Sequence, residues 1–358
     1  MEVGVQLIFA ADGWPGITDQ QLYDEEVRLA LLAEELGFDV IWAAEHHFFG
    51  YSVCPDNTQF LAYVAGATKR VDVGTAAVIM PWHEPLRVAE KIAMLDHLTH
   101  GRLRFGLGRG LSRREFAGFE GMGIRMEESR GRFDEGTEMV LEALRTGVIE
   151  GDGTYFTQPR TEIRPRPERS FEDRIYTVAS SDDSIESAAR FGGHLMMFAD
   201  RNWEARLPSV ERYRDLFRQF HGSEPPRALT ADFTLCVEDA STAEELATRY
   251  MGTYLASLLE HYEIMGTHFA DTDGYDAYAK ASEVLRTVGE SGFLEGFMQA
   301  GAWGTPDVIL EQLKWRRDLL GPFELATTFR FGGIPYEEAE ASMRLYAKEV
   351  LPVLHEWD

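Results

Sequence analysis

Hydrophobic residues along this chain form two alternating patterns, namely short continuous runs and longer stretches with an apolar residue every three or four positions. The short runs are typical of buried strands, and the longer spacing is typical of helices with one buried face. The predicted strands are 3–9, 40–44, 71–80, 102–107, 175–179, 194–198, 229–237 and 324–329. The predicted helices are 18–36, 85–100, 129–146, 184–191, 203–221, 242–259 and 336–350.

Eight strands that alternate with helices indicate an α/β protein with a parallel sheet, and their number favours a closed (β/α)8 TIM barrel over an open sheet. Residues at the helix ends support these boundaries. Thr18 and Gln21 have the spacing of a capping box, and Gly37 is suited to end the same helix. Pro85 and Pro335 stand at predicted helix starts, where a missing N–H is tolerated.

The segment 261–303 interrupts the alternation. It is rich in glycine, aspartate and aromatic residues, and its one weak helical pattern lies near 276–288. A weakly patterned segment of this length inside a barrel is more often functional than a simple connection. We therefore expect an inserted, lid-like segment near 261–303, with a tolerated surface insertion as the alternative.

Composition narrows the class of protein. The 358 residues, 44% of them hydrophobic, suit a single barrel domain spanning 1–358. The net charge of −25 argues against nucleic acid and anionic membrane as partners, because both attract basic surfaces. The two cysteines, Cys54 and Cys236, form no metal-type pair, and the start of the chain has no secretory signal pattern. We expect a soluble cytoplasmic protein.

Polar residues follow the predicted strand 40–44 directly, as Glu45-His46-His47. The carboxyl ends of barrel strands are where catalytic residues gather. Neighbouring side chains on extended backbone point in opposite directions, so two adjacent histidines rarely bind one ion. No helical His/Glu pair supports a metal site either, and we expect none. One of the two histidines is better suited to act as a general base or hydrogen-bond donor.

Three further strand ends carry unusual sequence. Gly74-Thr75-Ala76-Ala77 consists of small residues that either let a flat ring approach the backbone or serve tight barrel packing. Gly108-Arg109-Gly110 places a guanidinium among glycines, which suits a phosphate. Ser180-Ser181-Asp182-Asp183-Ser184 opens a helix, where the serines either cap the helix or bind an anion. A barrel would gather all of these ends on one face.

These stretches resemble the bacterial luciferase-like flavin monooxygenase family, especially its luciferase α-subunit branch. The likeness runs in order along nearly the whole chain. The matching stretches are Gly37-Phe38-Asp39, Glu45-His46-His47-Phe48, Val73-Gly74-Thr75-Ala76-Ala77, Leu95-Asp96, Gly101-Arg102, Phe105-Gly106, Arg109-Gly110-Leu111, Met126-Glu127-Glu128-Ser129-Arg130, Gly304-Thr305-Pro306 and Ala341-Ser342-Met343. The resemblance implies a barrel that binds FMN, with the reduced flavin supplied by a separate flavin reductase. We also expect a homodimer.

The resemblance assigns roles to individual positions. It implies that His46 is the catalytic residue and that Ala76-Ala77 forms a cis peptide beneath the flavin ring. Arg109 and Arg130 match contacts of the flavin phosphate. The full set expected to bind the cofactor is Glu45, Ala76, Ala77, Gly108, Arg109, Leu111, Arg130, Val178, Ala179, Ser180, Ser181 and Ser184.

The chain also departs from the luciferase pattern. Gly108 stands where the luciferase α-subunit has a reactive cysteine, so we expect a wider and chemically quieter pocket there. Ser180 replaces a glutamate and Glu115 replaces an aspartate. These changes argue against light emission. Six further residues either line an apolar substrate chamber or belong to the core, namely Trp42, Phe48, Met80, Trp82, Met197 and Phe198.

The implied function is a flavin-dependent monooxygenase. Reduced FMN would react with O2 to give a C4a-(hydro)peroxide that oxygenates a small apolar carbonyl or unsaturated substrate. Hydroxylation, Baeyer–Villiger oxidation and aldehyde oxidation remain open. The alternatives are a deazaflavin (F420)-dependent dehydrogenase on the same barrel, a non-catalytic flavin-binding subunit, and, least favoured, a metallohydrolase.

Overall fold

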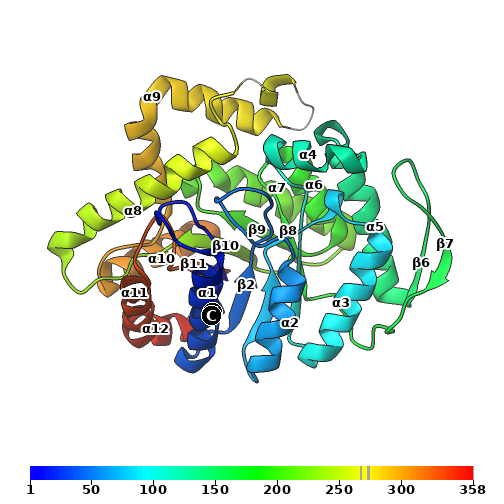
Figure 1. Ribbon diagram of the computed structural model, residues 1–358, viewed down its shortest axis with the longest axis horizontal. Helices are drawn as coiled ribbons and strands as arrows, with labels where there is room; N and C mark the ends of the chain where they lie inside the picture. The colour runs from blue at the N-terminus through cyan, green and yellow to red at the C-terminus, as the bar shows by residue number, and fades with distance from the viewer. Residues whose placement is uncertain (267, 272–274, 358) are drawn as a thin grey trace.

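A closed parallel barrel forms the centre of the molecule (Figure 1). The structure is a computed structural model that describes residues 1–266, 268–271 and 275–357. Within these residues the barrel strands are β1 (Val3–Leu7), β2 (Val40–Ala43), β3 (Asp72–Thr75), β4 (Val78–Ile79), β5 (Leu103–Gly108), β8 (Ile175–Val178), β9 (His194–Phe198), β10 (Ala228–Phe233) and β11 (Phe323–Thr328). They follow chain order around the barrel, and β11 pairs with β1 to close it. The predicted (β/α)8 TIM barrel is confirmed.

Two short strands, β3 and β4, occupy the position of the third barrel strand. The sequence predicts one strand within 71–80, but β3 ends at Thr75 and β4 resumes at Val78, where it pairs with β5. Between them the Ala76–Ala77 peptide bond is cis, as the resemblance implies. The backbone between β3 and β4 therefore leaves the ladder at the carboxyl end of the barrel.

Helices cover the outside of the barrel. The principal ones are α1 (Asp19–Leu36), α2 (Asn57–Ala67), α3 (Pro85–Thr99), α5 (Ser129–Thr146), α6 (Asp182–Phe191), α7 (Trp203–His221), α8 (Ala240–His261), α10 (Pro306–Leu320) and α11 (Tyr336–Glu349). The capping box of Thr18 and Gln21 is present, and Gly37 ends α1 in the left-handed region at φ 89°. α3 ends one residue earlier than predicted, because His100 takes the left-handed position at φ 56°.

Two barrel helices and a hairpin were not predicted. These helices are α2 and α10, and both carry buried residues at helical spacing, such as Ile309, Leu313 and Leu320 of α10. The Pro/Arg-rich connection after α5 contains the antiparallel pair β6 (Val148–Asp152) and β7 (Thr157–Glu162), which projects from the side of the barrel in Figure 1.

Trp42 occupies the interior of the barrel. Its side chain is buried and packs edge-on against Tyr176 with ring centroids 4.8 Å apart. A Cβ atom on Gly74 would lie 2.3 Å from Trp42 Cε3, and one on Gly4 would lie 2.7 Å from Trp42 Nε1. These two glycines therefore make room for the indole. The contact of Gly74 with Trp42 supports tight barrel packing as the role of this glycine, and not access of a flat ring to the backbone.

The inserted segment is more helical than its sequence pattern indicates. α9 extends over Asp276–Ala300, with a break at Gly289, and so runs well beyond the predicted patch at 276–288. Residues 267 and 272–274 of this segment lie outside the described residues. In Figure 1, α8 and α9 lie above the barrel strands. Ile264, Phe269, Tyr275 and Leu285 join one buried apolar cluster with residues near α4 (Arg113–Phe119).

Among the described residues, none of the helices combines the length and the apolar character that crossing a bilayer requires.

Candidate active site

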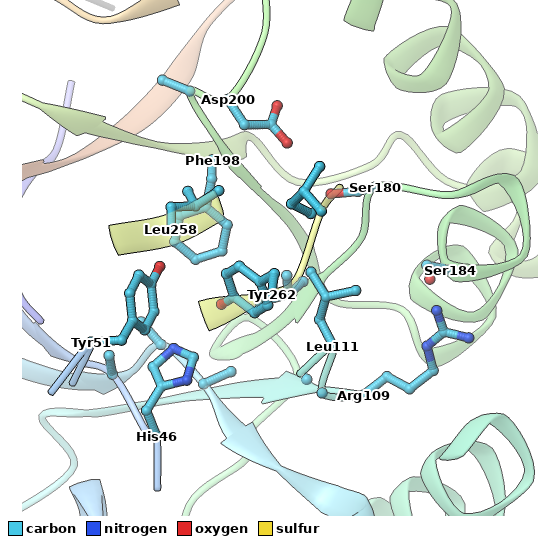
Figure 2. A pocket seen from close by; sticks show the side chains of 18 of the residues that line it. His46, Tyr51, Arg109, Leu111, Ser180, Ser184, Phe198, Asp200, Leu258 and Tyr262 are labelled. Carbon is cyan, nitrogen blue, oxygen red and sulfur yellow. The ribbon is translucent and has the colours of Figure 1, made fainter. Parts of the chain in front are cut away.

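A cavity of about 850 Å³ opens at the carboxyl ends of the barrel strands, beneath α8 and α9. Most of the residues that the sequence predicts for the site line it: Glu45, His46, Ala76, Ala77, Gly108, Arg109, Leu111, Val178, Ser180, Ser181 and Ser184. Arg130 and Ala179 do not. Ala179 is buried, and Arg130 lies behind Ser184. Figure 2 shows that the cavity has two ends, with His46 and Tyr51 at one and Arg109 and Ser184 at the other.

Small side chains form one wall of the cavity between these ends. Ala76 and Ala77 both line it, and Asn57 Nδ2 holds their loop by donating to the carbonyl oxygens of Ala43 and Ala77, each at 3.1 Å. Gly108 lines the cavity as expected, next to Ile79. Ile79 fills the space beside it, since its Cδ1 lies 2.9 Å from where a Cβ atom on Gly108 would be.

Glu115 holds His46 in place at the first end. His46 Nδ1 lies 3.1 Å from Glu115 Oε1, and the same oxygen accepts the backbone N–H of His47 at 2.7 Å. The carboxylate is almost completely buried. Burial raises its pKa, but the charge and hydrogen bonds of His46 and His261 outweigh burial and lower the pKa of Glu115 to about 2. Glu115 is therefore ionised at neutral pH.

His47 turns away from the cavity, as strand alternation predicts. Its ring packs edge-on against Trp82 and Phe119, with centroids 4.9 and 4.8 Å away. His47 Nε2 lies 3.3 Å from Glu45 Oε1. Only one histidine of the Glu45-His46-His47 stretch thus faces the space where a ligand would lie.

Glu45 lines the cavity, but its carboxylate is held by protein groups. Oε1 lies 2.7 Å from His83 Nε2, and Oε2 accepts the backbone N–H of Ile79 at 3.0 Å. Burial raises the pKa of Glu45, and the neighbouring His83 and His47 more than offset this, so that the pKa is lowered. His83 was not found by the sequence analysis. Its carboxylate contact ties the β4 loop to the end of β2.

The second end is built from the start of α6. Ser181 Oγ accepts the Ser184 N–H at 3.4 Å, so this serine caps the helix as one interpretation proposed. Arg130 donates to Ser184 Oγ at 2.8 Å and to Ser187 Oγ at 3.3 Å. Burial, followed by the positive charge of Arg109, lowers the pKa of Arg130.

Arg109 lies beside this helix start. Its Cζ is 3.9 Å from the ring centroid of Tyr275, a residue of the inserted segment. Asp182 and Asp183 also line this end and bring negative charge. The guanidinium of Arg109, three serines and a helix N-terminus therefore line one corner of the cavity, and Arg130 lies behind them. Such donors bind phosphates in proteins.

Aromatic residues form the wall near His46, and sequence reasoning missed most of them. Tyr51, Phe233, Tyr254, Tyr262 and Phe297 line the cavity, and Tyr51 Oη lies 2.6 Å from Tyr254 Oη. Burial raises the pKa of Tyr51 to about 12, so its hydroxyl stays neutral. The sequence offered only one weak signal, the tyrosines spaced along 250–262.

Of the six residues considered for an apolar substrate chamber, Trp82 and Phe198 line the cavity. Met80 and Met197 are fully buried core residues, Trp42 fills the barrel interior, and Phe48 is 60% exposed.

We predict that the free energy of unfolding decreases at acid pH because Glu115 becomes protonated. Its pKa is lowered in the folded protein, so its contribution is complete above its ordinary value of 4.5 and declines as the pH falls towards 2. In urea unfolding, the stability advantage of the wild type over Glu115→Gln should shrink as the pH falls from 4.5 to 2.5, by up to about 1.4 kcal/mol per pH unit. A constant difference over this range would contradict the ionised, histidine-paired carboxylate.

Comparison with known proteins places these features in a family. The alkanal monooxygenase α chain of Photorhabdus luminescens is 26% identical to this chain over 349 residues, which cover 96% of this chain and 95% of the relative. A monooxygenase from Streptomyces bottropensis has a similar structure, with a TM-score of 0.83, 29% identity, and coverage of 99% of this chain and 100% of that chain.

Two more distant structures show the same fold. The oxygenating constituent of 3,6-diketocamphane monooxygenase from Pseudomonas putida, in complex with FMN, has a TM-score of 0.74 and 18% identity, covering 98% of each chain. An F420-dependent secondary alcohol dehydrogenase has a TM-score of 0.71 and 16% identity, covering 99% of each chain. The sequence model of the luciferase-like monooxygenases matches residues 1–321. The chain belongs to the luciferase-like monooxygenase family and is an enzyme of the flavin-dependent monooxygenase type.

Proposed function

We propose that the chain is a monooxygenase that uses reduced FMN and O2 to oxygenate a small apolar carbonyl or unsaturated substrate. One observation carries the proposal. A single cavity has at one end a corner with hydrogen-bond donors suited to a phosphate and at the other an aromatic wall with His46 on it. A phosphorylated, flat cofactor needs the first, and an apolar substrate needs the second. Bound there, the flavin would supply the reaction with O2, which amino-acid side chains cannot perform.

The residues at the α6 corner fit a flavin phosphate. Arg130 Nε is buried and has no hydrogen-bond partner among the described residues. The lowered pKa of Arg130 reflects burial and the nearby charge of Arg109, two costs that a dianion would relieve. We propose that Arg109 contacts the phosphate together with Ser180, Ser181 and Ser184, and that Arg130 orients Ser184 from behind.

The wall formed by Ala76, Ala77 and Gly108 fits the flavin ring. Its side chains are small, and it lines the same cavity as the phosphate corner and His46. A flat ring could therefore lie against it without displacing a bulky side chain. We propose that Leu111 and Val178, which line the same cavity, pack beside the ring and its chain.

His46 is proposed to move a proton during the reaction. Because Glu115 is ionised, it can only accept a hydrogen bond, so Nδ1 of His46 is the donor. In the neutral ring this leaves Nε2 without a proton. A carboxylate that fixes the tautomer and orientation of a histidine is a common arrangement in acid–base catalysis. His46 Nε2 would act as the proton acceptor in the cavity.

Water exclusion is the proposed role of the segment 261–303. Tyr262, Ile264, Phe293 and Phe297 from this segment line the cavity. Reduced flavin that has reacted with O2 releases hydrogen peroxide unproductively when water reaches it, so a cover improves coupling. The segment is proposed to act as a mobile lid over this end of the barrel.

We also propose that a separate reductase supplies the reduced flavin and that the enzyme is a cytoplasmic homodimer. α2 and α3 pack side by side and expose large apolar side chains: Tyr63 is 64% exposed, Met94 50% and Leu98 54%. Exposed apolar residues gathered on two adjacent helices support an interface between copies of the chain. Both cysteines are free and buried, which suits a reducing compartment.

The phosphate assignment predicts a selective loss of affinity. Arg109→Ala should weaken the binding of FMN by about 10- to 100-fold, because a charge-assisted contact is worth about 1.5–3 kcal/mol. Riboflavin, which lacks the phosphate, should be little affected. Fluorescence titration measures both, and Arg145→Ala, on an exposed arginine of α5, is the matched control. Equal weakening of the two ligands would mean that Arg109 acts through packing.

The catalytic assignment separates the adjacent histidines. His46→Ala should lower turnover by about 100-fold or more with little effect on thermal unfolding, since general acid–base groups contribute about 10²–10⁴-fold. His47→Ala should lower thermal stability instead, because its ring packs against Trp82 and Phe119. The assignment is wrong if His47→Ala abolishes activity while His46→Ala keeps it. Turnover with F420 in place of FMN would favour the dehydrogenase alternative.

The lid assignment predicts protection by ligand. Trypsin can cut after Lys280 and Arg286, which are exposed residues of α9. FMN with substrate should slow cleavage at these sites and leave cleavage after the exposed Arg160 of β7 unchanged. Mass spectrometry of the fragments measures both rates. Equal rates at all three sites, with and without ligand, would leave 261–303 as a surface insertion.

A further inference from the structure

Besides His46, a second imidazole lies against the Glu115 carboxylate. His261 Nε2 is 3.7 Å from Glu115 Oε1, the oxygen that also faces His46 Nδ1. His261 is only 2% exposed, and neither of its ring nitrogens has a hydrogen-bond partner among the described residues. It does not line the cavity, so it can act on the reaction only through its neighbours.

The ring of His261 is held firmly. It stacks on Tyr51 with centroids 4.3 Å apart and planes 9° from parallel, and it meets His46 edge-on at 5.4 Å. Burial lowers the pKa of His261, so it is neutral at pH 7. A neutral imidazole beside a carboxylate offers its N–H dipole to that carboxylate and thereby weakens the pull of the carboxylate on a proton at His46.

The position of His261 along the chain connects it to the lid. It is the last residue of α8, where the segment 261–303 begins. Ser112 Oγ donates to its carbonyl oxygen at 3.3 Å, and Arg113 pairs with both carboxylate oxygens of Glu263, at 2.6 and 3.0 Å. Arg114 Nη1 donates to the Glu260 carbonyl oxygen at 3.4 Å. Residues 112–115 and 260–263 thus hold each other, and we call these two stretches the clasp. Glu115 is the last residue of the first stretch.

We infer that His261 is a positioning residue that keeps His46 unprotonated by competing with it for Glu115. The clasp makes this effect of His261 depend on the position of the lid. With the lid seated, Glu115 is shared by two imidazoles, and His46 is ready to accept a proton. With the clasp open, His46 would be the one imidazole left beside Glu115, and the carboxylate would favour the protonated form of His46. The catalytic meaning rests on the proposed function, whereas the effect on His46 does not.

Few other groups around this pair carry charge. Glu115 and Arg114 come from α4, and Tyr51, Tyr254 and Tyr262 surround the rings with hydroxyls whose pKa values are raised by burial. The tyrosines therefore stay neutral near pH 7. Arg114 stays charged at every pH considered. Among the groups named in this paragraph and the two histidines, imidazole is the side chain whose ordinary pKa lies between pH 5 and 8.

NMR of protein labelled with ¹⁵N-histidine tests the inference without flavin. The signals of His46 are identified by their loss in His46→Gln, and the pH midpoint of His46 is then measured in each variant. His261→Phe keeps the stacking on Tyr51 but removes the ring nitrogens. It should raise the His46 midpoint by at least about 0.3 pH unit, a fraction of the 1–3 units that a nearby charge causes. His261→Gln, which keeps an N–H donor, should stay near the wild-type value.

An unchanged His46 midpoint in His261→Phe, or equal shifts in the Phe and Gln variants, would overturn the inference. If FMN turnover were absent while the midpoint shifted as expected, only the proposed function would fail.

The clasp is tested by Glu263→Gln, which removes the ion pair with Arg113. Hydrogen exchange in residues 260–266 should become faster, and the His46 midpoint should move in the same direction as in His261→Phe. Glu142→Gln is the control, because Glu142 and Arg145 form an exposed pair of the same geometry, at 2.6 and 2.9 Å, on α5. Faster exchange without any shift of the His46 midpoint would separate the lid from His46 and contradict the coupling.

Discussion

The geometry of the site depends on one buried carboxylate, that of Glu115. Its Oε1 atom accepts the N–H of His47, faces His46 Nδ1 and lies beside His261. Three separate segments therefore meet at one atom: the loop after β2, the helix α4 and the end of α8. A buried charge without partners costs free energy, so the folded state is favoured when these segments supply partners for the carboxylate. The pairing holds His46 at the edge of the cavity.

The barrel supplies the second constraint. Parallel strands that close into a barrel end on the same face, so the small wall at Ala76–Ala77, the serines at the start of α6 and the His46 loop border one space. That space is polar at one end and aromatic at the other. A cofactor with a phosphate and a flat ring, followed by an apolar substrate, fits this order of surfaces. The segment 261–303 completes the aromatic end with Tyr262 and Phe297.

The sequence predicted those features that local patterns determine. The eight barrel strands, the caps at Thr18 and Gly37, and the opposite directions of His46 and His47 follow from periodicity and backbone geometry. The resemblance to a family added the cis peptide at Ala76–Ala77, which no pattern in the chain would indicate.

Features made by contacts between distant residues were not predictable in this way. Tyr51 and Tyr254 are 203 positions apart, yet their hydroxyls form one hydrogen bond in the cavity wall. His83 reaches Glu45 across 38 positions, and Ile79 fills the space beside Gly108. The extent of α9 was also missed, because its buried apolar residues are widely spaced and belong to three different clusters, Leu285 to one, Phe297 to a second and Ala300 to a third.

The most direct test of the account is the rate at which bound, reduced FMN is oxidised by O2. The protein would be mixed anaerobically with FMNH2, and oxygen would then be added in a stopped-flow spectrometer without substrate. The account predicts stoichiometric binding and reoxidation that is much slower than that of FMNH2 free in solution, because the covered cavity shields the flavin from water. Reoxidation at the rate of free FMNH2, or failure to bind FMNH2 at all, would contradict it.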